Sequence, residues 1–185
     1  MATNSTEMTL LLGGARSGKS ALATRIAAAA GESVTFVATA EPLWSGDGKG
    51  DAEMTARIAA HRLERPVGWE TVEDPRLDLE VLAGIDAEQF VVVDCLTLWV
   101  ANRLGDSDEA VVAHATAMAE LLRRRETGSV VVSNEVGSGI VPFEPTTRRY
   151  RDLLGWVNIA VASVADRTLL VVAGRVLEIG PADVG

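Results

Sequence analysis

The sequence predicts an α/β fold in which helices flank a mainly parallel β-sheet. Short, continuous runs of Val, Leu and Phe, such as FVVVD at 90–94, alternate along the chain with longer helical patterns. Strands that are apolar on both faces are typical of parallel sheets covered by helices on both sides. A glycine-rich segment at 13–20 follows the first apolar run, as expected where a strand turns into a helix.

Six apolar runs are expected to form strands, and a seventh lies near the end of the chain. They cover residues 8–12, 33–39, 69–73, 90–94, 129–133 and 168–174, followed by the terminal segment VLEI at 176–179. Runs of this length, bounded by turn residues, indicate strands rather than helices.

Helical patterns fill the segments between these strands. They cover residues 19–30, 51–64, 76–83, 106–126 and 146–166. Gly31 ends the first, Asp51 is expected to cap the second, and Pro66 stops the second at Arg65. Because no repeat or low-complexity linker divides the chain, residues 8–180 are predicted to form one nucleotide-binding domain after a disordered tail at 1–7.

Composition argues against several classes of protein. The chain has 185 residues, of which 48% are hydrophobic, so it can bury a substantial core. Its net charge of -9 argues against a broadly basic surface for nucleic acid. No apolar run reaches the roughly 20 residues that span a membrane, and MATNSTE lacks the features of a secretory signal. The single cysteine, Cys95, excludes an intrachain disulfide and fits a reducing cytoplasm.

The segment GGARSGKS carries the clearest chemical signal in the chain. It matches the phosphate-binding pattern G-x-x-x-x-G-K-[ST], or P-loop, between an expected strand and an expected helix. Lys19 is expected to reach the β- and γ-phosphates of a nucleoside triphosphate, and the Ser20 hydroxyl to bind Mg²⁺. Glycines let the backbone approach the phosphates, and the helix N-terminus adds positive potential. The expected contacts are Gly13, Gly14, Ala15, Arg16, Ser17, Gly18, Lys19 and Ser20.

Two acidic residues are candidates for a second metal ligand. Asp94 closes the run FVVVD, at the edge of a parallel sheet where ligands bind, although it could simply cap the helix that follows. Glu135 follows the run SVVVS and is a rival. Its alternative is a loop carboxylate tied to the backbone near Gly137 and Gly139.

One of the two histidines, His61, lies on a charged face of the expected helix from Asp51. Glu53, Arg57 and His61 are spaced four residues apart, so they share one face. A histidine in this position is more often solvated than catalytic, but nearby arginines could balance a polyphosphate. The other histidine, His114, is expected to be a partly exposed structural residue.

These features indicate a P-loop enzyme or a nucleotide-dependent switch. A regulatory GTPase would normally carry an Asn-Lys-x-Asp element to read guanine, and neither Lys19 nor Lys49 stands in that context. A small-metabolite kinase without a covalent intermediate stays open at this point, whereas the regulatory switch is disfavoured.

Six blocks of the sequence, in order, resemble one enzyme family. They are GGARSGKS at 13–20, VAT at 37–39, RIAAHRLERPVGWETVE at 57–73, VVDCLTLWVANRL at 92–104, SNEVGSGIVP at 133–142 and YRDLLGWVN at 150–158. On these blocks the chain is similar to the bifunctional adenosylcobinamide kinase/adenosylcobinamide-phosphate guanylyltransferases of cobalamin biosynthesis, the CobU/CobP family. The resemblance extends from Leu10 to Gly174.

The resemblance implies a RecA-like P-loop NTPase fold, a cytoplasmic location and a homotrimer. It implies that ATP or GTP phosphorylates adenosylcobinamide, with Mg²⁺ as cofactor. GMP is then transferred from GTP to the product through a guanylyl-histidine at His61, which gives adenosylcobinamide-GDP. The further nucleotide contacts that the resemblance implies are Ala38, Thr39, Ala40, Arg62, Leu63, Glu64, Arg65, Glu73 and Asp94.

Overall fold

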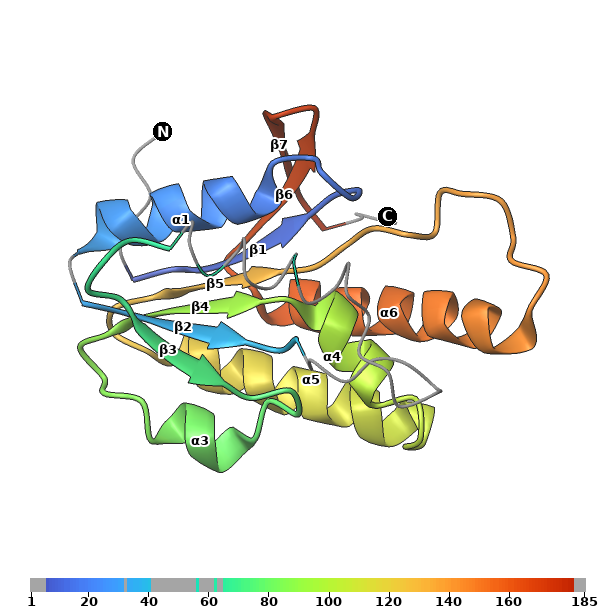
Figure 1. Cartoon of the computed structure of the whole chain (residues 1–185), viewed down its shortest axis with the longest axis horizontal. Helices are drawn as coiled ribbons and strands as arrows, with labels where there is room; N and C mark the ends of the chain where they lie inside the picture. The colour runs from blue at the N-terminus through green and yellow to red at the C-terminus, as the bar shows by residue number, and fades with distance from the viewer. Residues whose placement is uncertain (1–5, 32, 41–55, 57–61, 63–64, 182–185) are drawn as a thin grey trace.

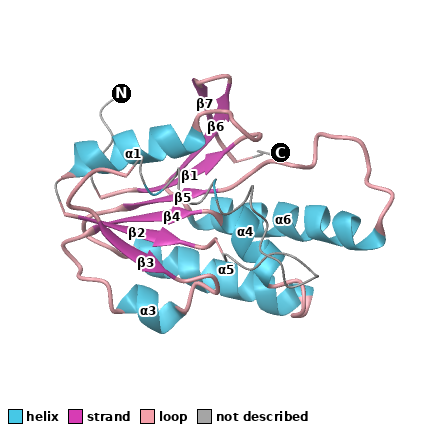
Figure 2. Ribbon diagram, viewed as in Figure 1, coloured by secondary structure: helices cyan, strands magenta, loops and turns pink. Residues whose placement is uncertain are grey.

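Seven strands of the described chain form a single β-sheet (Figures 1 and 2). The computed structural model describes residues 6–31, 33–40, 56, 62 and 65–181. The strands are β1 (Met8–Leu12), β2 (Val34–Ala38), β3 (Glu70–Glu73), β4 (Phe90–Asp94), β5 (Ser129–Val132), β6 (Arg167–Val172) and β7 (Arg175–Ile179). Their order is β3-β2-β4-β5-β1-β6-β7, and every pair is parallel except β6 with β7. The predicted mainly parallel α/β fold is therefore confirmed.

Helices cover both faces of this sheet (Figure 1). They are α1 (Lys19–Ala30), α3 (Leu79–Ala83), α4 (Leu96–Asn102), α5 (Asp108–Arg123) and α6 (Pro145–Val164). Helix α1 lies on one face, while α5 and α6 pack against each other on the opposite face (Figure 1).

Alternating side chains of the strands build two separate hydrophobic cores. Leu10 faces α5 and α6 in the larger core, whereas its neighbour Leu11 faces α1 in the smaller one. On β4, Val91 and Val93 belong to the larger core and Val92 to the smaller. Because successive side chains of a strand point to opposite faces, a strand buried on both sides must be apolar throughout.

Helices α3 and α5 begin later than predicted because a capping residue fixes the start of each. The Asp78 side chain accepts a hydrogen bond from Glu80 N, so α3 begins at Leu79 rather than at residue 76. The Ser107 side chain likewise accepts from Ala110 N, and α5 begins at Asp108 rather than at 106. Such short polar side chains satisfy the N–H groups that a helix leaves free at its start.

Helix α4 is not among the predicted helix ranges, although a helix after Asp94 is implied by the alternative that Asp94 acts as a cap; the residue at the cap position is Cys95. The helix starts only two residues after β4 ends, so its apolar residues look like an extension of a buried strand. Leu96, Trp99 and Val100 are fully buried, which is the spacing of one helix face. The Trp99 indole N–H donates to the carbonyl of Arg76 at 2.8 Å, which ties α4 to the segment before α3.

Parts of two predicted segments lie outside the described residues. Of the expected helix at 51–64, only Ala56 and Arg62 are described, and both are helical. Residues 1–5 of the expected tail are likewise outside the described part. Glu7 is joined to the sheet, because its carbonyl accepts from Ser129 N at 3.1 Å.

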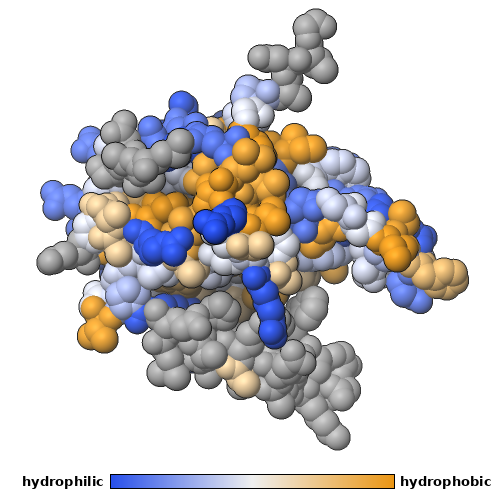
Figure 3. Space-filling view, turned by 90° about the horizontal axis from the view of Figure 1, so that it is seen from above, coloured by the Kyte–Doolittle hydropathy of each residue, from blue (hydrophilic) through white to orange (hydrophobic). Residues whose placement is uncertain are grey.

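Exposed apolar side chains gather on the hairpin of β6 and β7 (Figure 3). They are Val172, Val176, Leu177 and Ile179. A second group, formed by Ile140, Val141 and Phe143, lies on the loop before α6. Within the described part of the chain, no helix combines the length and apolar character needed to cross a membrane.

Candidate functional site

The glycine-rich loop between β1 and α1 folds around the side chain of its own lysine. The Lys19 ammonium donates to the carbonyl of Gly13 at 2.8 Å, to that of Gly14 at 2.7 Å and to the Ser17 hydroxyl at 3.4 Å. The loop backbone is left-handed at Gly18, where φ is 102°, just before α1 begins. A positively charged group is therefore held at a helix N-terminus, where an anion is favoured.

Burial lowers the pKa of Lys19, whereas the nearby Cys95 and the carboxylate of Asp94 act to raise it. Only 7% of the Lys19 residue surface is exposed. A buried cation of this kind is costly unless an anion or dipole compensates it. The loop carbonyls and Asp94 provide this compensation, and bound phosphates would add to it.

The first glycine of the loop is required by its contact with β6. A Cβ atom at Gly13 would lie 2.2 Å from the backbone oxygen of Val171, and φ at this position is 152°. Strand β6 therefore packs directly against the loop. The local sequence pattern alone does not reveal this contact.

Replacing Gly13 by alanine is expected to lower the free energy of unfolding by about 1–3 kcal/mol, because the added methyl group must displace backbone. Gly14→Ala is the matched control, since a Cβ atom at Gly14 meets nothing within 4 Å. Denaturant unfolding of both variants checks this prediction. Equal stability of the two variants would contradict it.

Asp94 stands at the carboxyl end of β4, beside two neighbouring strand ends. In the sheet register it pairs with Ala38 of β2 and with Val132 of β5. Its negative charge acts to raise the pKa values of both Lys19 and Arg65, each of which burial lowers. Asp94 is thus placed to act on cations from two sides of the sheet edge.

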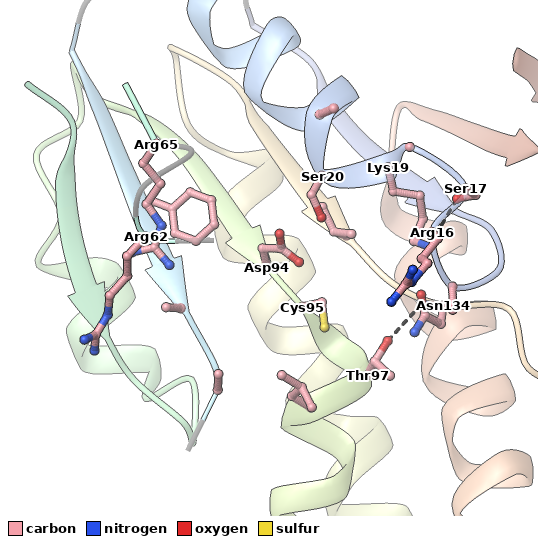
Figure 4. Close-up of a pocket in the computed structure, with 18 of the residues that line it drawn as sticks. Arg16, Ser17, Lys19, Ser20, Arg62, Arg65, Asp94, Cys95, Thr97 and Asn134 are labelled. Atoms are coloured by element: carbon pink, nitrogen blue, oxygen red, sulfur yellow. Dashed lines mark hydrogen bonds between the residues drawn. The ribbon is translucent and has the colours of Figure 1, made fainter. Parts of the chain in front are cut away.

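Ser20 and Asp94 both line the cavity (Figure 4). A hydroxyl and a carboxylate are hard oxygen donors, which suit Mg²⁺ when substrate phosphates supply further ligands. In the described part of the chain, no group of three or more His, Cys, Asp or Glu residues could hold a metal by itself. The Ser20 and Asp94 donors therefore fit a metal that arrives with a nucleotide.

The segment after β4 is fixed by the side chain of Thr39. The Thr39 hydroxyl accepts from Cys95 N at 2.9 Å and donates to Cys95 O at 2.7 Å. The carbonyl of Thr39 accepts from the Asn102 side chain at 2.9 Å, and the same amide donates to Pro75 O. Thr39 is fully buried and is not among the residues that line the cavity, so its side chain positions the residues around Asp94.

Replacing Thr39 by valine is expected to lower the free energy of unfolding by about 1–3 kcal/mol, because it leaves polar groups of Cys95 without their partner. We also expect a lower kcat from the displacement of Asp94. Thr116→Val removes a hydroxyl that bonds Val112 O on α5, so it serves as the control for activity. Denaturant unfolding and steady-state kinetics measure both effects. An unchanged kcat in Thr39→Val would rule out the positioning role.

Two arginines and an acidic residue border the opposite side of the cavity. The Arg65 guanidinium lies 4.0 Å from the centre of the Phe36 ring and donates to the Thr71 hydroxyl at 3.2 Å. Arg62 forms an ion pair with Glu73 at the end of β3. Arg62, Arg65 and Glu73 therefore line the cavity from the side of β2 and β3.

These groups enclose a cavity of about 540 Å³ at the carboxyl edge of the sheet (Figure 4). Ligands of open α/β sheets bind at this edge. Of the predicted contacts, the cavity is lined by Ala15, Arg16, Ser17, Gly18, Lys19, Ser20, Ala38, Ala40, Arg62, Arg65, Glu73 and Asp94. The described structure thus brings together residues from four strand ends and the phosphate loop.

Comparison with known proteins identifies one family. Residues 9–179 match the family model described as cobinamide kinase / cobinamide phosphate guanyltransferase. The chain belongs to this family. It is 42% identical over 167 residues to the bifunctional adenosylcobalamin biosynthesis protein CobP of Pseudomonas aeruginosa, a match that covers 89% of this chain and 92% of the relative. It is 37% identical over 182 residues to the CobU protein of Escherichia coli, with 90% and 96% covered.

A solved structure from Pyrococcus horikoshii OT3 is also similar. Its TM-score is 0.56 at 10% sequence identity, and the match covers 98% of this chain and 90% of that one. At this level of identity the similarity shows the fold alone. It agrees with the α/β architecture described above.

Some residues considered for this site either do not line the cavity or fall outside the described part of the chain. Gly13 and Gly14 hold Lys19 through their carbonyls and do not line the cavity. Glu135 accepts from Gly137 N at 2.7 Å and from the Ser138 hydroxyl at 2.8 Å, so it is the backbone-tied loop carboxylate rather than a rival metal ligand. His61, Leu63 and Glu64 lie outside the described residues.

The second histidine has the structural role that the sequence predicts. His114 is half-buried, its ring lies 5.5 Å from that of Trp99, and its Nε2 is 2.7 Å from Leu77 O. Trp99 is fully buried, as expected for a packing residue.

Other residues that line the cavity were not predicted from the sequence. Cys95 lies at the cavity wall next to Asp94, and burial raises the pKa of its thiol to about 11. Thr97, Leu98 and Asn134 also line the cavity. Thr97 and Leu98 belong to α4, whose range was not predicted. Asn134 follows β5 and could have been found from the rule that ligands bind beyond strand ends.

Proposed function

We propose that this chain phosphorylates adenosylcobinamide with ATP or GTP and then transfers GMP from GTP to adenosylcobinamide phosphate. The product is adenosylcobinamide-GDP, and the transfer passes through a guanylyl-histidine at His61. The observation that carries the proposal is that the phosphate loop, Asp94 and Arg62 line the same cavity. Arg62 directly follows His61 in the sequence. Membership of the cobinamide kinase / cobinamide phosphate guanyltransferase family supports both reactions.

In the kinase step, the aminopropanol hydroxyl of adenosylcobinamide attacks the γ-phosphorus of the nucleotide. The bond from that phosphorus to the bridging oxygen breaks, the nucleoside diphosphate leaves, and the hydroxyl proton is released. Phosphoryl transfer depends mainly on positioning and on stabilisation of charge. Lys19 and the backbone N–H groups of the loop supply both.

In the transfer step, a neutral imidazole nitrogen of His61 attacks the α-phosphorus of GTP, and pyrophosphate leaves. A phosphate oxygen of adenosylcobinamide phosphate then attacks the same phosphorus, and the P–N bond breaks to restore His61. Lys19 stabilises the negative charge of the leaving group. The attack requires the neutral form of the imidazole, whose nitrogen carries the attacking electron pair.

Ser20 and Asp94 would hold Mg²⁺, which supplies charge neutralisation at the phosphate oxygens when bound. The remaining predicted contacts, Leu63 and Glu64, belong to this proposal through the family resemblance. The resemblance also implies nucleotide contacts at Ala38, Thr39, Ala40, Arg62, Arg65 and Glu73. All of these except Thr39 line the cavity.

We also propose a homo-oligomer, a trimer by family resemblance, located in the cytoplasm. The exposed apolar side chains of β6 and β7 support an association between subunits (Figure 3). Large exposed apolar patches commonly mark protein interfaces. Sedimentation analysis would show a monomer if this proposal is wrong.

The decisive experiment supplies the protein with Mg²⁺, adenosylcobinamide and GTP labelled at the α-phosphate. We expect label in a corrinoid product that contains GMP. Without the corrinoid, we expect an acid-labile, base-stable adduct on the protein. A phosphorylated corrinoid without any labelled product would instead indicate a simple small-metabolite kinase.

A further inference from the structure

Asn134 lies between the phosphate loop and Asp94. It lies two residues beyond the end of β5, which is hydrogen-bonded to β1 on one side and to β4 on the other. Val132 pairs with Leu11 of β1 and with Asp94 of β4, so the chain beyond Val132 runs between the loop and the carboxylate. The backbone continues this pairing, because Ser133 N donates to Leu11 O at 2.9 Å and Glu135 N to Gly13 O at 3.1 Å.

The side chain of Asn134 points into the nucleotide cavity. Successive residues of an extended segment point to opposite faces. Val132 and Asn134 both line the cavity on the α1 side, whereas Ser133 faces the other way and donates to the Asn158 side chain of α6 at 2.6 Å. Figure 4 shows Asn134 beside Arg16 and below the turn of the phosphate loop.

Two side chains fix the backbone of Asn134 and leave its own side chain available. Asn134 N donates to the Thr97 hydroxyl at 2.9 Å, and the Asn158 amide donates to Asn134 O at 3.0 Å. Thr97 is itself held through its carbonyl, which accepts from the Tyr150 hydroxyl at 3.2 Å. Among the described residues, the Asn134 side-chain amide has no hydrogen-bond partner, although its backbone is anchored from both α4 and α6.

An amide in this position suits one part of the substrate. In a P-loop, the lysine and the loop N–H groups surround the β-phosphate, and the γ-phosphate extends away from the loop. An amide N–H₂ group donates to phosphate oxygens without the charge that a carboxylate would oppose to them. The anchored backbone fixes this donor in place before the nucleotide binds, which limits the entropy lost on contact.

We propose that the side-chain amide of Asn134 contacts the terminal phosphate of the bound nucleoside triphosphate. The contact distinguishes a triphosphate from a diphosphate and holds the γ-phosphoryl group for transfer. Because the ligand is taken to be a nucleoside triphosphate, this role rests on the proposed function. Asn134 lies in the block SNEVGSGIVP, but the resemblance assigns it no contact with the nucleotide.

The test compares binding of GTP, as its non-hydrolysable β,γ-imido analogue, with binding of GDP to the full-length chain in Mg²⁺. Asn134→Ala is expected to weaken binding of the triphosphate analogue at least about tenfold, the effect of losing a hydrogen bond to a charged group. Binding of GDP is expected to be unchanged. Asn134→Leu keeps the side-chain volume without a polar atom and should show the same selective loss.

Asn158→Ala is the matched control, because it removes an amide that anchors the backbone rather than one that faces the cavity. We expect this variant to weaken the triphosphate analogue less than either Asn134 variant does, because the Asn134 amide itself is retained. Thermal unfolding of each variant confirms that it is folded. A parallel loss, or no loss, in both Asn134 variants would overturn the proposal. Failure of the proposed function would appear differently, as absence of corrinoid product from wild-type protein that still prefers the triphosphate.

Discussion

Lys19→Ala is expected to lower kcat/KM of both the kinase and the guanylyl transfer reactions by at least about a hundredfold, the scale of losing one preorganised charge stabiliser. Lys19 is the cation that the loop carbonyls of Gly13 and Gly14 hold at the centre of the phosphate site. Both reactions break a bond within the same triphosphate, so both lose stabilisation of the leaving group. Separate assays of phosphorylated corrinoid and of adenosylcobinamide-GDP measure the two effects.

Lys19→Arg tests whether positive charge alone is sufficient. The lysine is nearly buried and contacts two carbonyls at 2.7–2.8 Å, so the larger, planar guanidinium does not fit the same space. We expect this variant to be as impaired as Lys19→Ala. Arg25→Ala, on the exposed side of the same helix, is the control that should keep full activity. Either Lys19 variant retaining both activities would exclude the phosphate-loop assignment.

His61→Ala is expected to separate the two reactions. Loss of a nucleophile lowers kcat by about a thousandfold or more, so guanylyl transfer should disappear with the labelled adduct. The kinase step forms no bond to His61 and should continue, which would let adenosylcobinamide phosphate accumulate. Labelling with GTP marked at the α-phosphate, together with analysis of the corrinoid products, measures both outcomes.

The second histidine provides a matched control for this experiment. His114 packs against Trp99 and bonds Leu77 O on the α5 side of the sheet, so His114→Ala should reduce stability and still form the labelled adduct. Undiminished label on His61→Ala would exclude His61 as the nucleophile. If folded His114→Ala lost the label instead, the proposal would have named the wrong histidine as the nucleophile.

The fold could be predicted from the sequence because its evidence is local. Runs such as FVVVD are apolar at every position, which suits a parallel strand buried on both faces. The range of helix α4 was not predicted because Leu96 and Trp99 closely follow the apolar run of β4. Only the backbone distinguishes the two elements. Helix ends shifted where Asp78 and Ser107 form caps that a periodicity pattern does not resolve.

The sequence by itself determined the phosphate loop. Gly18, Lys19 and Ser20 are neighbours along the chain, and their geometry depends mainly on the local turn from strand to helix. The sequence also distinguished the two histidines. His114 was expected to be structural, and the family resemblance implied that His61 is the nucleophile.

Only the tertiary structure decided how distant residues share this site. Strand order brings Asn134 of the β5 end between the loop after β1 and Asp94 of β4, although these residues lie far apart in the sequence. The buried Thr39 fixes the backbone of Cys95 through its hydroxyl, and Glu135 is bonded within its own loop. Such roles depend on non-local hydrogen bonds and burial, which residue type and spacing along the chain do not encode.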